Sequence, residues 1–158
     1  MKKSFFLFFA FLTLFAVMAC TPVTTATTAT TTGTGTTTTM LDYDDFGTLA
    51  NYDEVFTLSD ITYLVYMYSP ECHNCITLKP EMLAFAAAYG EHNIFFFDVS
   101  GAVFGDRDAF LYTVDKTQML VPFLILVKDN GYFGSYLGTN EIRAGIQAIT
   151  AGTLSDWE

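Results

Sequence analysis

Two long apolar runs with a helical stretch between them constrain the fold more than any other feature of this sequence. Residues 61–68 and 93–99 consist mostly of β-branched, aromatic and other apolar side chains, a pattern typical of strands buried on both faces. Between these runs, apolar side chains recur at three- and four-residue steps from Cys72 until Gly90. A strand, a helix and a second strand at this spacing predict a βαβ unit with parallel strands, and therefore an α/β domain.

The remainder of the chain predicts further elements of the same sheet. We expect a helix or an irregular entry over residues 41–56, a short helix over 106–114 with Phe110 and Leu111 facing inward, a strand over 123–128, a turn over 129–131, an antiparallel strand over 132–137 and a closing helix over about 140–149. One domain over residues 40–158 follows, with a central mixed sheet of about four strands flanked by helices.

The amino terminus has the pattern of an export signal. Lys2 and Lys3 precede an apolar run over residues 4–16, and residues 17–20 read Val-Met-Ala-Cys. These four residues resemble a bacterial lipobox, which implies that residues 1–19 form a lipoprotein signal peptide and that Cys20 carries a lipid. The expected location is then the extracytoplasmic face of a bacterial membrane, with the bilayer bound through Cys20. An uncleaved signal anchor is the alternative, because the run is near the shortest length that spans a bilayer.

Residues 20–39 are dominated by threonine and contain no charged or aromatic side chain. A segment of this composition buries too little apolar surface to offset the entropy lost on ordering, so we expect a disordered tether. A flexible chain of this length has a root-mean-square reach of about 25 Å, which holds a small domain off a bilayer.

The charge of the chain excludes one class of partner. The formal net charge is -10 at pH 7, and no cluster of lysine or arginine is present. A nucleic-acid partner is therefore not expected, and the acidic residues are most simply a solvated surface.

Cys72 and Cys75 are the residues that carry chemistry. The C-x-x-C spacing falls where the first strand gives way to the helix, so Cys72 is expected at the helix amino terminus. Unpaired N–H groups and the helix dipole stabilise an anion there, and the thiolate is the nucleophilic form of cysteine. Cys72 is therefore predicted to attack a disulfide, and Cys75, one turn into the helix, to resolve the mixed disulfide.

Several further residues carry a resemblance to the thioredoxin-like superfamily over residues 60–149. Pro80 stands five residues after Cys75, the sequence Leu-Val-Pro-Phe-Leu spans residues 120–124, and Gly131 and Gly138 fall near turn and late-strand glycines of the family. The resemblance implies a thioredoxin-like α/β fold and a cis peptide bond before Pro122. It also implies that Val121 and Pro122 shape a peptide-binding edge next to the cysteine pair.

The sequence also departs from the thioredoxin pattern. Tyr66 occupies the position of a buried aspartate that serves as a proton relay in the family, and Glu71 replaces a tryptophan directly before the first cysteine. An anion at Glu71 disfavours a thiolate at Cys72, whereas a protonated His73 favours it. His73 and Asn74 stand between the cysteines in place of Gly-Pro, so the direction of electron flow stays open.

The expected function is that of a membrane-anchored, extracytoplasmic thiol–disulfide oxidoreductase. Its substrates would be protein thiols and disulfides, a membrane redox partner would recycle it, and no cofactor is needed because the electrons reside in the cysteine pair. The main alternative is a non-catalytic thioredoxin-fold accessory or binding lipoprotein, of the kind that resembles bacteriocin-transport accessory proteins.

Two other interpretations of the cysteine pair remain open. A structural disulfide is one, although so short a loop constrains the unfolded chain little. A metal site is the other: either zinc bound by Cys72, His73 and Cys75, or copper bound by the two thiols. Zinc usually needs four ligands, however, and the only other histidine is His92.

Overall fold

The computed structural model describes residues 40–60, 62–90, 93–101 and 104–154. The predicted signal peptide, the lipidated Cys20 and the threonine-rich tether lie outside the described residues, as does His92. No helix within the described part of the chain is both long enough and apolar enough to cross a bilayer.

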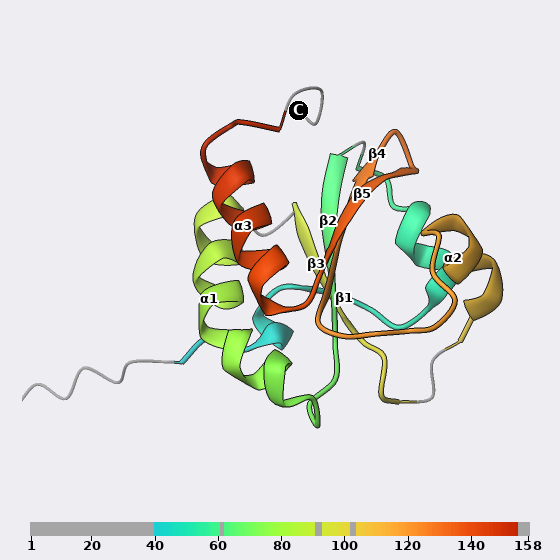
Figure 1. Cartoon of the computed structure of the whole chain (residues 1–158), viewed down its shortest axis with the longest axis horizontal. Helices are drawn as coiled ribbons and strands as arrows, with labels where there is room; N and C mark the ends of the chain where they lie inside the picture. The colour runs from blue at the N-terminus through green and yellow to red at the C-terminus, as the bar shows by residue number, and fades with distance from the viewer. Residues whose placement is uncertain (1–39, 61, 91–92, 102–103, 155–158) are drawn as a thin grey trace, which may run out of the picture. The chain divides into compact units, whose positions relative to one another are not determined.

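The described chain forms a five-stranded sheet with helices on both faces (Figure 1). In chain order the elements are the 3₁₀ helix η1 (Tyr43–Asp45), β1 (Gly47–Leu49), the 3₁₀ helix η2 (Tyr52–Phe56), β2 (Thr62–Tyr68), α1 (His73–Tyr89), β3 (Ile94–Asp98), α2 (Arg107–Thr113), β4 (Phe123–Lys128), β5 (Gly131–Leu137) and α3 (Thr139–Thr150).

The strand order is β1-β3-β2-β4-β5. β3 pairs in parallel with both β1 and β2, whereas β4 pairs antiparallel with β2 and with β5. The predicted βαβ unit is thus present, and the turn between β4 and β5 places Asp129 and Asn130 at φ values of 51° and 58°. The architecture is the thioredoxin-like α/β fold that the sequence resemblance implies.

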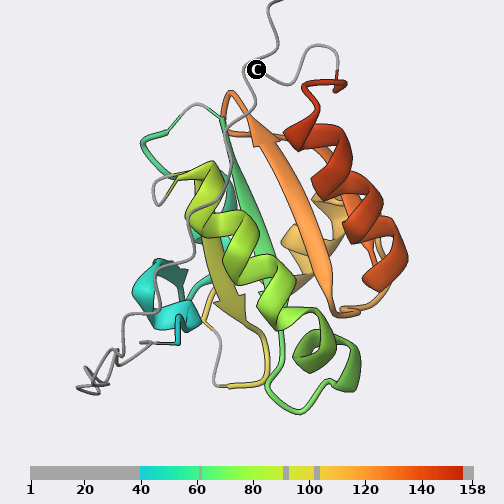
Figure 2. The ribbon, with the colours of Figure 1, turned by 90° about the vertical axis from the view of Figure 1, so that its left-hand side faces the viewer.

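Side chains that alternate along the central strands build two cores. On one face, Leu64 and Tyr66 of β2 pack with α1 and α3, which lie side by side over the sheet (Figure 2). On the other face, Tyr63 and Val65 of the same strand pack with α2 and η2. Because both faces are covered, β2 and β4 are almost continuously apolar, as the sequence pattern predicted.

The predicted number of strands was too low by one. The missed strand is β1, which has three residues and lies at the edge of the sheet. So short a strand cannot show alternation, and the acidic residues around it gave the stretch a near-helical spacing. Two of the acidic residues, Asp42 and Asp45, instead form a capping box at η1, and the neutral Asn51 caps η2.

Candidate functional site

A disulfide joins Cys72 and Cys75 where β2 leads into α1. The backbone turns there through residues 69–71, with the Cys72 N–H donating a hydrogen bond of 3.1 Å to the Ser69 carbonyl. Cys72 is the N-cap of α1, and the Cα atoms of the two cysteines lie 5.2 Å apart. α1 then continues through Pro80 and ends at Gly90, which has a φ of 115°.

The two cysteines differ in their accessibility. Cys72 is half-buried, whereas Cys75 is only 2% exposed. Glu71, His73 and Asn74 around them are all exposed. Cys72 is therefore more accessible to a substrate than Cys75.

Two backbone groups contact the sulfur of Cys72. The N–H of Cys75 donates a hydrogen bond to it at 3.2 Å, in the manner of a helix N-cap. A donor in this position stabilises a thiolate once the disulfide is reduced. The carbonyl oxygen of Val121 lies 3.6 Å from the same sulfur. In the disulfide the sulfur carries no hydrogen, so this is a close contact, and only the reduced thiol can donate to it.

The contact with Val121 brings the segment before β4 to the cysteine pair. The Val121–Pro122 peptide bond is cis, as the resemblance implies. Pro122 is buried, and its carbonyl accepts a hydrogen bond of 2.9 Å from the Gly138 N–H, whereas Val121 is half-buried and Leu120 is 45% exposed. The structure thus places the Val121 carbonyl beside Cys72, with Pro122 next to it in the chain.

Tyr66 of β2 lies in the core between the sheet and α1 and is completely buried. Its ring packs near those of Tyr43, Tyr68 and Phe96. The hydroxyls of Tyr66 and Tyr43 are buried, and neither makes a hydrogen bond with a described residue. Burial is the main cause that raises the pKa of both phenols, so both stay neutral.

A cleft of about 330 Å³ opens beside Cys75. α1 lines it with Cys75, Ile76 and Lys79, and η1 contributes Asp42, Tyr43 and Asp44. The floor includes Tyr68 and Asp98, which are register partners at the ends of β2 and β3. Burial, and then the nearby carboxylate of Asp98, raise the pKa of Tyr68 to about 12.

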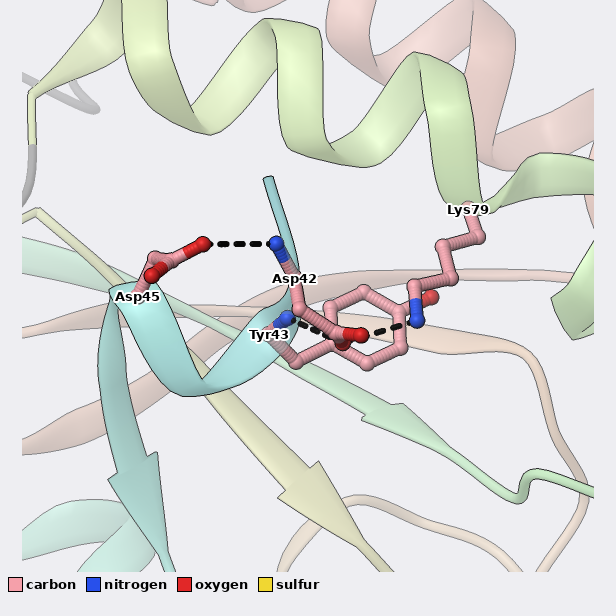
Figure 3. A network of polar contacts seen from close by, with 4 residues as sticks. All are labelled: Asp42, Tyr43, Asp45 and Lys79. Atoms are coloured by element: carbon pink, nitrogen blue, oxygen red, sulfur yellow. Dashed lines mark hydrogen bonds and ion pairs between the residues drawn. The ribbon is translucent and has the colours of Figure 1, made fainter. Parts of the chain in front are cut away.

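Lys79 ties η1 to α1 across this cleft (Figure 3). Its ammonium group lies 2.7 Å from Oδ1 of Asp42 and 4.7 Å from the centroid of the Tyr43 ring. The hydrogen bond from Lys79 is the main cause that lowers the pKa of the Asp42 carboxyl, and the Tyr43 N–H adds to it. The ion pair therefore holds one wall of the cleft against the helix that carries the cysteines.

Sequence reasoning did not identify this cleft. Its walls come from η1, from the ends of two parallel strands and from α1, so no single segment of the sequence contains it. One signal was available: Asp98 ends an apolar run that was predicted to pair in parallel with the strand before Cys72. Carboxyl ends of parallel strands meet at one edge of a sheet, which is the edge where the cysteines lie.

The described residues hold no group of three or more His, Cys, Asp or Glu side chains arranged to bind a metal ion. His73 is exposed, and His92 lies outside the described residues.

Comparisons with known proteins found similar solved structures but no matching sequence family. No family model matches the sequence, and no curated protein matches it. The structure is similar to that of mitochondrial thioredoxin 3 from Saccharomyces cerevisiae in its oxidized form, with 21% identity over 66% of this chain and 96% of that chain and a TM-score of 0.47. It is also similar to thioredoxin f from spinach chloroplast (18% identity, 66% and 93% covered, TM-score 0.47) and to Fasciola hepatica thioredoxin (20% identity, 67% and 98% covered, TM-score 0.49). Likenesses of this degree carry no information about activity.

Proposed function

We propose that this protein is a thiol–disulfide oxidoreductase that acts on protein thiols and disulfides through Cys72 and Cys75. In the reducing direction, the Cys72 thiolate attacks a substrate disulfide and Cys75 resolves the mixed disulfide. In the oxidising direction, a substrate thiolate attacks the sulfur of Cys72 in the internal disulfide. The cysteine pair itself holds the two electrons, so the exchange needs no cofactor.

One observation carries this proposal. The half-buried sulfur of Cys72 accepts the N–H of Cys75 at the amino terminus of α1 and is disulfide-bonded to a partner that is 2% exposed. A nucleophilic sulfur needs access and stabilisation of its anion, and a resolving sulfur needs protection from competing attack. Cys72 is accessible and its anion would be stabilised, whereas Cys75 is protected by burial.

Single substitutions of the cysteines test the two roles. Two activities are measured with the full chain in detergent: reduction of insulin disulfides and refolding of reduced ribonuclease. The proteins compared are the wild type, Cys72→Ser and Cys75→Ser. Cys72→Ser should abolish both activities. Cys75→Ser should accumulate a mixed disulfide between Cys72 and the substrate, visible as a higher-mass species that dithiothreitol removes.

Cys20→Ser is the matched control for these variants, because it removes a cysteine outside the proposed redox pair. It should leave both redox activities unchanged. Full activity of Cys72→Ser, or the absence of a trapped species with Cys75→Ser, would refute the assigned roles.

We further propose that Cys20 is lipidated and anchors the domain to the extracytoplasmic face of a bacterial membrane, where a membrane redox partner recycles the pair. The sequence pattern at residues 17–20 supports this. In a bacterial host, the wild type should incorporate labelled palmitate and sediment with membranes. Cys20→Ser should incorporate no label, and equal labelling of the two proteins contradicts lipidation.

The rival function is that of an accessory protein in which the fold only presents a docking surface. It is favoured by Tyr66, a buried neutral side chain at the position where the thioredoxin pattern has a proton-relay carboxylate. Absence of both redox activities in the wild type would support it.

If the wild type is active, the reduction potential of the cysteine pair gives the direction of electron flow. A value of about −270 mV indicates a reductant and a value of about −120 mV an oxidant.

A further inference from the structure

We propose that Asp98 accepts the proton of Cys75, through water in the cleft, when Cys75 resolves the mixed disulfide. The inference rests on the proposed function and assigns the proton transfer of its second step. It concerns a residue that lies 23 positions after Cys75 in the chain and reaches the cysteine pair only through the fold.

Cys75 needs a proton acceptor because of where it lies. Its side chain is 2% exposed, and burial disfavours the thiolate that must attack the sulfur of Cys72. Tyr66 stands where the thioredoxin pattern has a carboxylate, and its phenol stays protonated because burial raises its pKa. Any base must therefore act from the cleft that Cys75 lines.

The titratable groups around Cys75 come from four elements. α1 contributes Lys79 next to the cleft and the exposed His73; β2 and β3 contribute Tyr66, Tyr68 and Asp98; η1 contributes Asp42, Tyr43 and Asp44. The three phenols have raised pKa values and stay neutral.

Lys79 and Asp42 neutralise each other in an ion pair of 2.7 Å, and the lowered pKa of Asp42 makes it a weak base. Asp44 and Asp98 are the carboxylates of the cleft that remain.

The position of Asp98 distinguishes it from Asp44. Asp98 ends β3, is half-buried, and stands in register with Tyr68 on the face of the sheet that α1 covers. Its Oδ1 accepts hydrogen bonds from the backbone N–H and the hydroxyl of Ser100, at 2.9 and 2.6 Å. Oδ2 accepts none from the described residues, so the carboxylate is oriented while one oxygen stays available. Asp44, in contrast, is exposed on a 3₁₀ helix.

The cleft provides a path between the two groups. Its volume of about 330 Å³ is many times what one water molecule needs, and its walls offer polar partners in Ser69, Tyr68 and the carboxylates. A relay of water between a buried thiol and a half-buried carboxylate is therefore sterically and chemically feasible.

The resolving step by Cys75 conserves protons and electrons. The S–H bond of Cys75 breaks, and its proton passes through water to the carboxylate of Asp98. The Cys75 sulfur bonds to the sulfur of Cys72, the bond from Cys72 to the substrate sulfur breaks, and its electron pair leaves as the substrate thiolate. The cysteine pair is oxidised by two electrons, the substrate disulfide is reduced, and Asp98 returns its proton to solvent.

Rapid mixing of the reduced full chain, carrying Cys20→Ser so that Cys72 and Cys75 are its only thiols, with dithiobis-nitrobenzoate separates the two steps. Attack by Cys72 releases one coloured thiolate in a first phase, and attack by Cys75 on the mixed disulfide releases a second. Asp98→Asn keeps the shape and an oxygen for Ser100 but removes the base. It should slow the second phase about 10- to 100-fold at neutral pH and leave the first unchanged, because a general base contributes on this order or more.

The pH profile distinguishes a proton acceptor from a structural role. In the wild type, the rate of the second phase should depend only weakly on pH near neutrality, because Asp98 rather than hydroxide takes the proton. In Asp98→Asn it should rise steadily with pH, because only solvent removes the proton. Formate should partly restore the second phase of Asp98→Ala, since a small carboxylate fits the cleft.

Asp44→Asn is the matched control, with the same charge removed from the same cleft, and it should retain wild-type rates in both phases. An equal slowing by Asp44→Asn, or a wild-type second phase that rises with pH across the whole range, overturns the assignment to Asp98. Failure of the proposed function is distinguishable: the wild type would then release no second thiolate at any pH.

Discussion

Tyr63 and Tyr66 lie three residues apart on β2, and both are completely buried, yet only the hydroxyl of Tyr63 has a hydrogen-bond partner. Tyr63 faces the α2 side of the sheet and donates a bond of 3.0 Å to the carbonyl of Val55. Tyr66 faces the α1 side, where its hydroxyl makes no hydrogen bond with a described residue. The two residues form a natural matched pair for the energetics of buried hydroxyls.

Removing each hydroxyl should therefore have different effects on stability. Tyr63→Phe leaves the Val55 carbonyl unpaired and should lower the free energy of unfolding by about 1–2 kcal/mol. Tyr66→Phe removes a buried group with no partner, so the change should stay within about 0.5 kcal/mol of zero or be stabilising. Urea denaturation of the three proteins measures both values. Equal losses in the two variants would show that the Tyr66 hydroxyl is bonded in solution.

Much of this fold follows from local sequence patterns. The apolar run before Cys72 predicted β2 within one residue, and the predicted third strand coincides with β4. The helix predicted from Cys72 to Gly90 is α1, whose cap and end are these two residues. These predictions succeeded because burial on both faces and helix capping leave strong signals in adjacent residues.

The remaining features depend on contacts between distant segments. β1 is a strand because Gly47, Thr48 and Leu49 pair with β3, and three residues carry too little pattern to reveal that. The cleft depends on the ion pair between Lys79 and Asp42, which are 37 residues apart. The sequence could identify the cysteine pair as a reactive site, but it could not identify which carboxylates surround the buried sulfur.

Glu71 should modulate the reactivity of Cys72 through its charge. It is exposed and directly precedes the cysteine, so its carboxylate disfavours the neighbouring thiolate. In the reduced protein, Glu71→Gln should accelerate alkylation of Cys72 by iodoacetamide at mildly acidic pH by about 2- to 3-fold, the effect of a weak, solvent-exposed interaction. Because salt screens such charges, the acceleration should shrink at high ionic strength.

Asp108→Asn supplies the control for Glu71→Gln. It removes an equal charge from α2, which packs on the opposite face of the sheet from α1 (Figure 1). Its alkylation rate should equal that of the wild type. An equal acceleration in both variants would mean that total charge, rather than the position of Glu71, controls the thiolate.

The ion pair between Asp42 and Lys79 should make stability depend on pH in the acid range. The folded protein lowers the pKa of Asp42 below its ordinary value of 3.8, mainly through the hydrogen bond from Lys79. The ionised Asp42 side chain therefore stabilises the folded protein fully above pH 3.8, and this stabilisation is lost as the pH falls through the lower pKa of the folded state. Because the Asp42 side chain is 61% exposed, the contribution should be only about 0.5 kcal/mol.

Asp42→Asn isolates the charge, because asparagine is also a good N-cap and preserves the acceptor at η1. Urea denaturation at neutral pH should show a loss of about 0.5 kcal/mol, and the difference from the wild type should shrink as the pH falls below the ordinary value of 3.8. Lys79→Met should give a similar loss at neutral pH, and the double variant should lose less than the sum. A difference that persists at the lowest pH would assign the effect of Asp42 to capping instead of charge.

Reduction of the disulfide should leave the protein folded. The bond between Cys72 and Cys75 closes a loop of four residues within one turn of α1, so it removes little entropy from the unfolded chain. The loop-closure relation gives at most about 2 kcal/mol for a loop of this size, and the N–H of Cys75 offsets part of it by stabilising the Cys72 thiolate. Urea denaturation with and without dithiothreitol should therefore give two cooperative transitions whose free energies of unfolding differ by less than about 2 kcal/mol.

The variant Cys72→Ser/Cys75→Ser should unfold like the reduced protein, since it lacks the same bond. Loss of the cooperative transition on reduction would instead mean that the bond is structural, because an exchangeable pair requires a protein that is folded in both redox states.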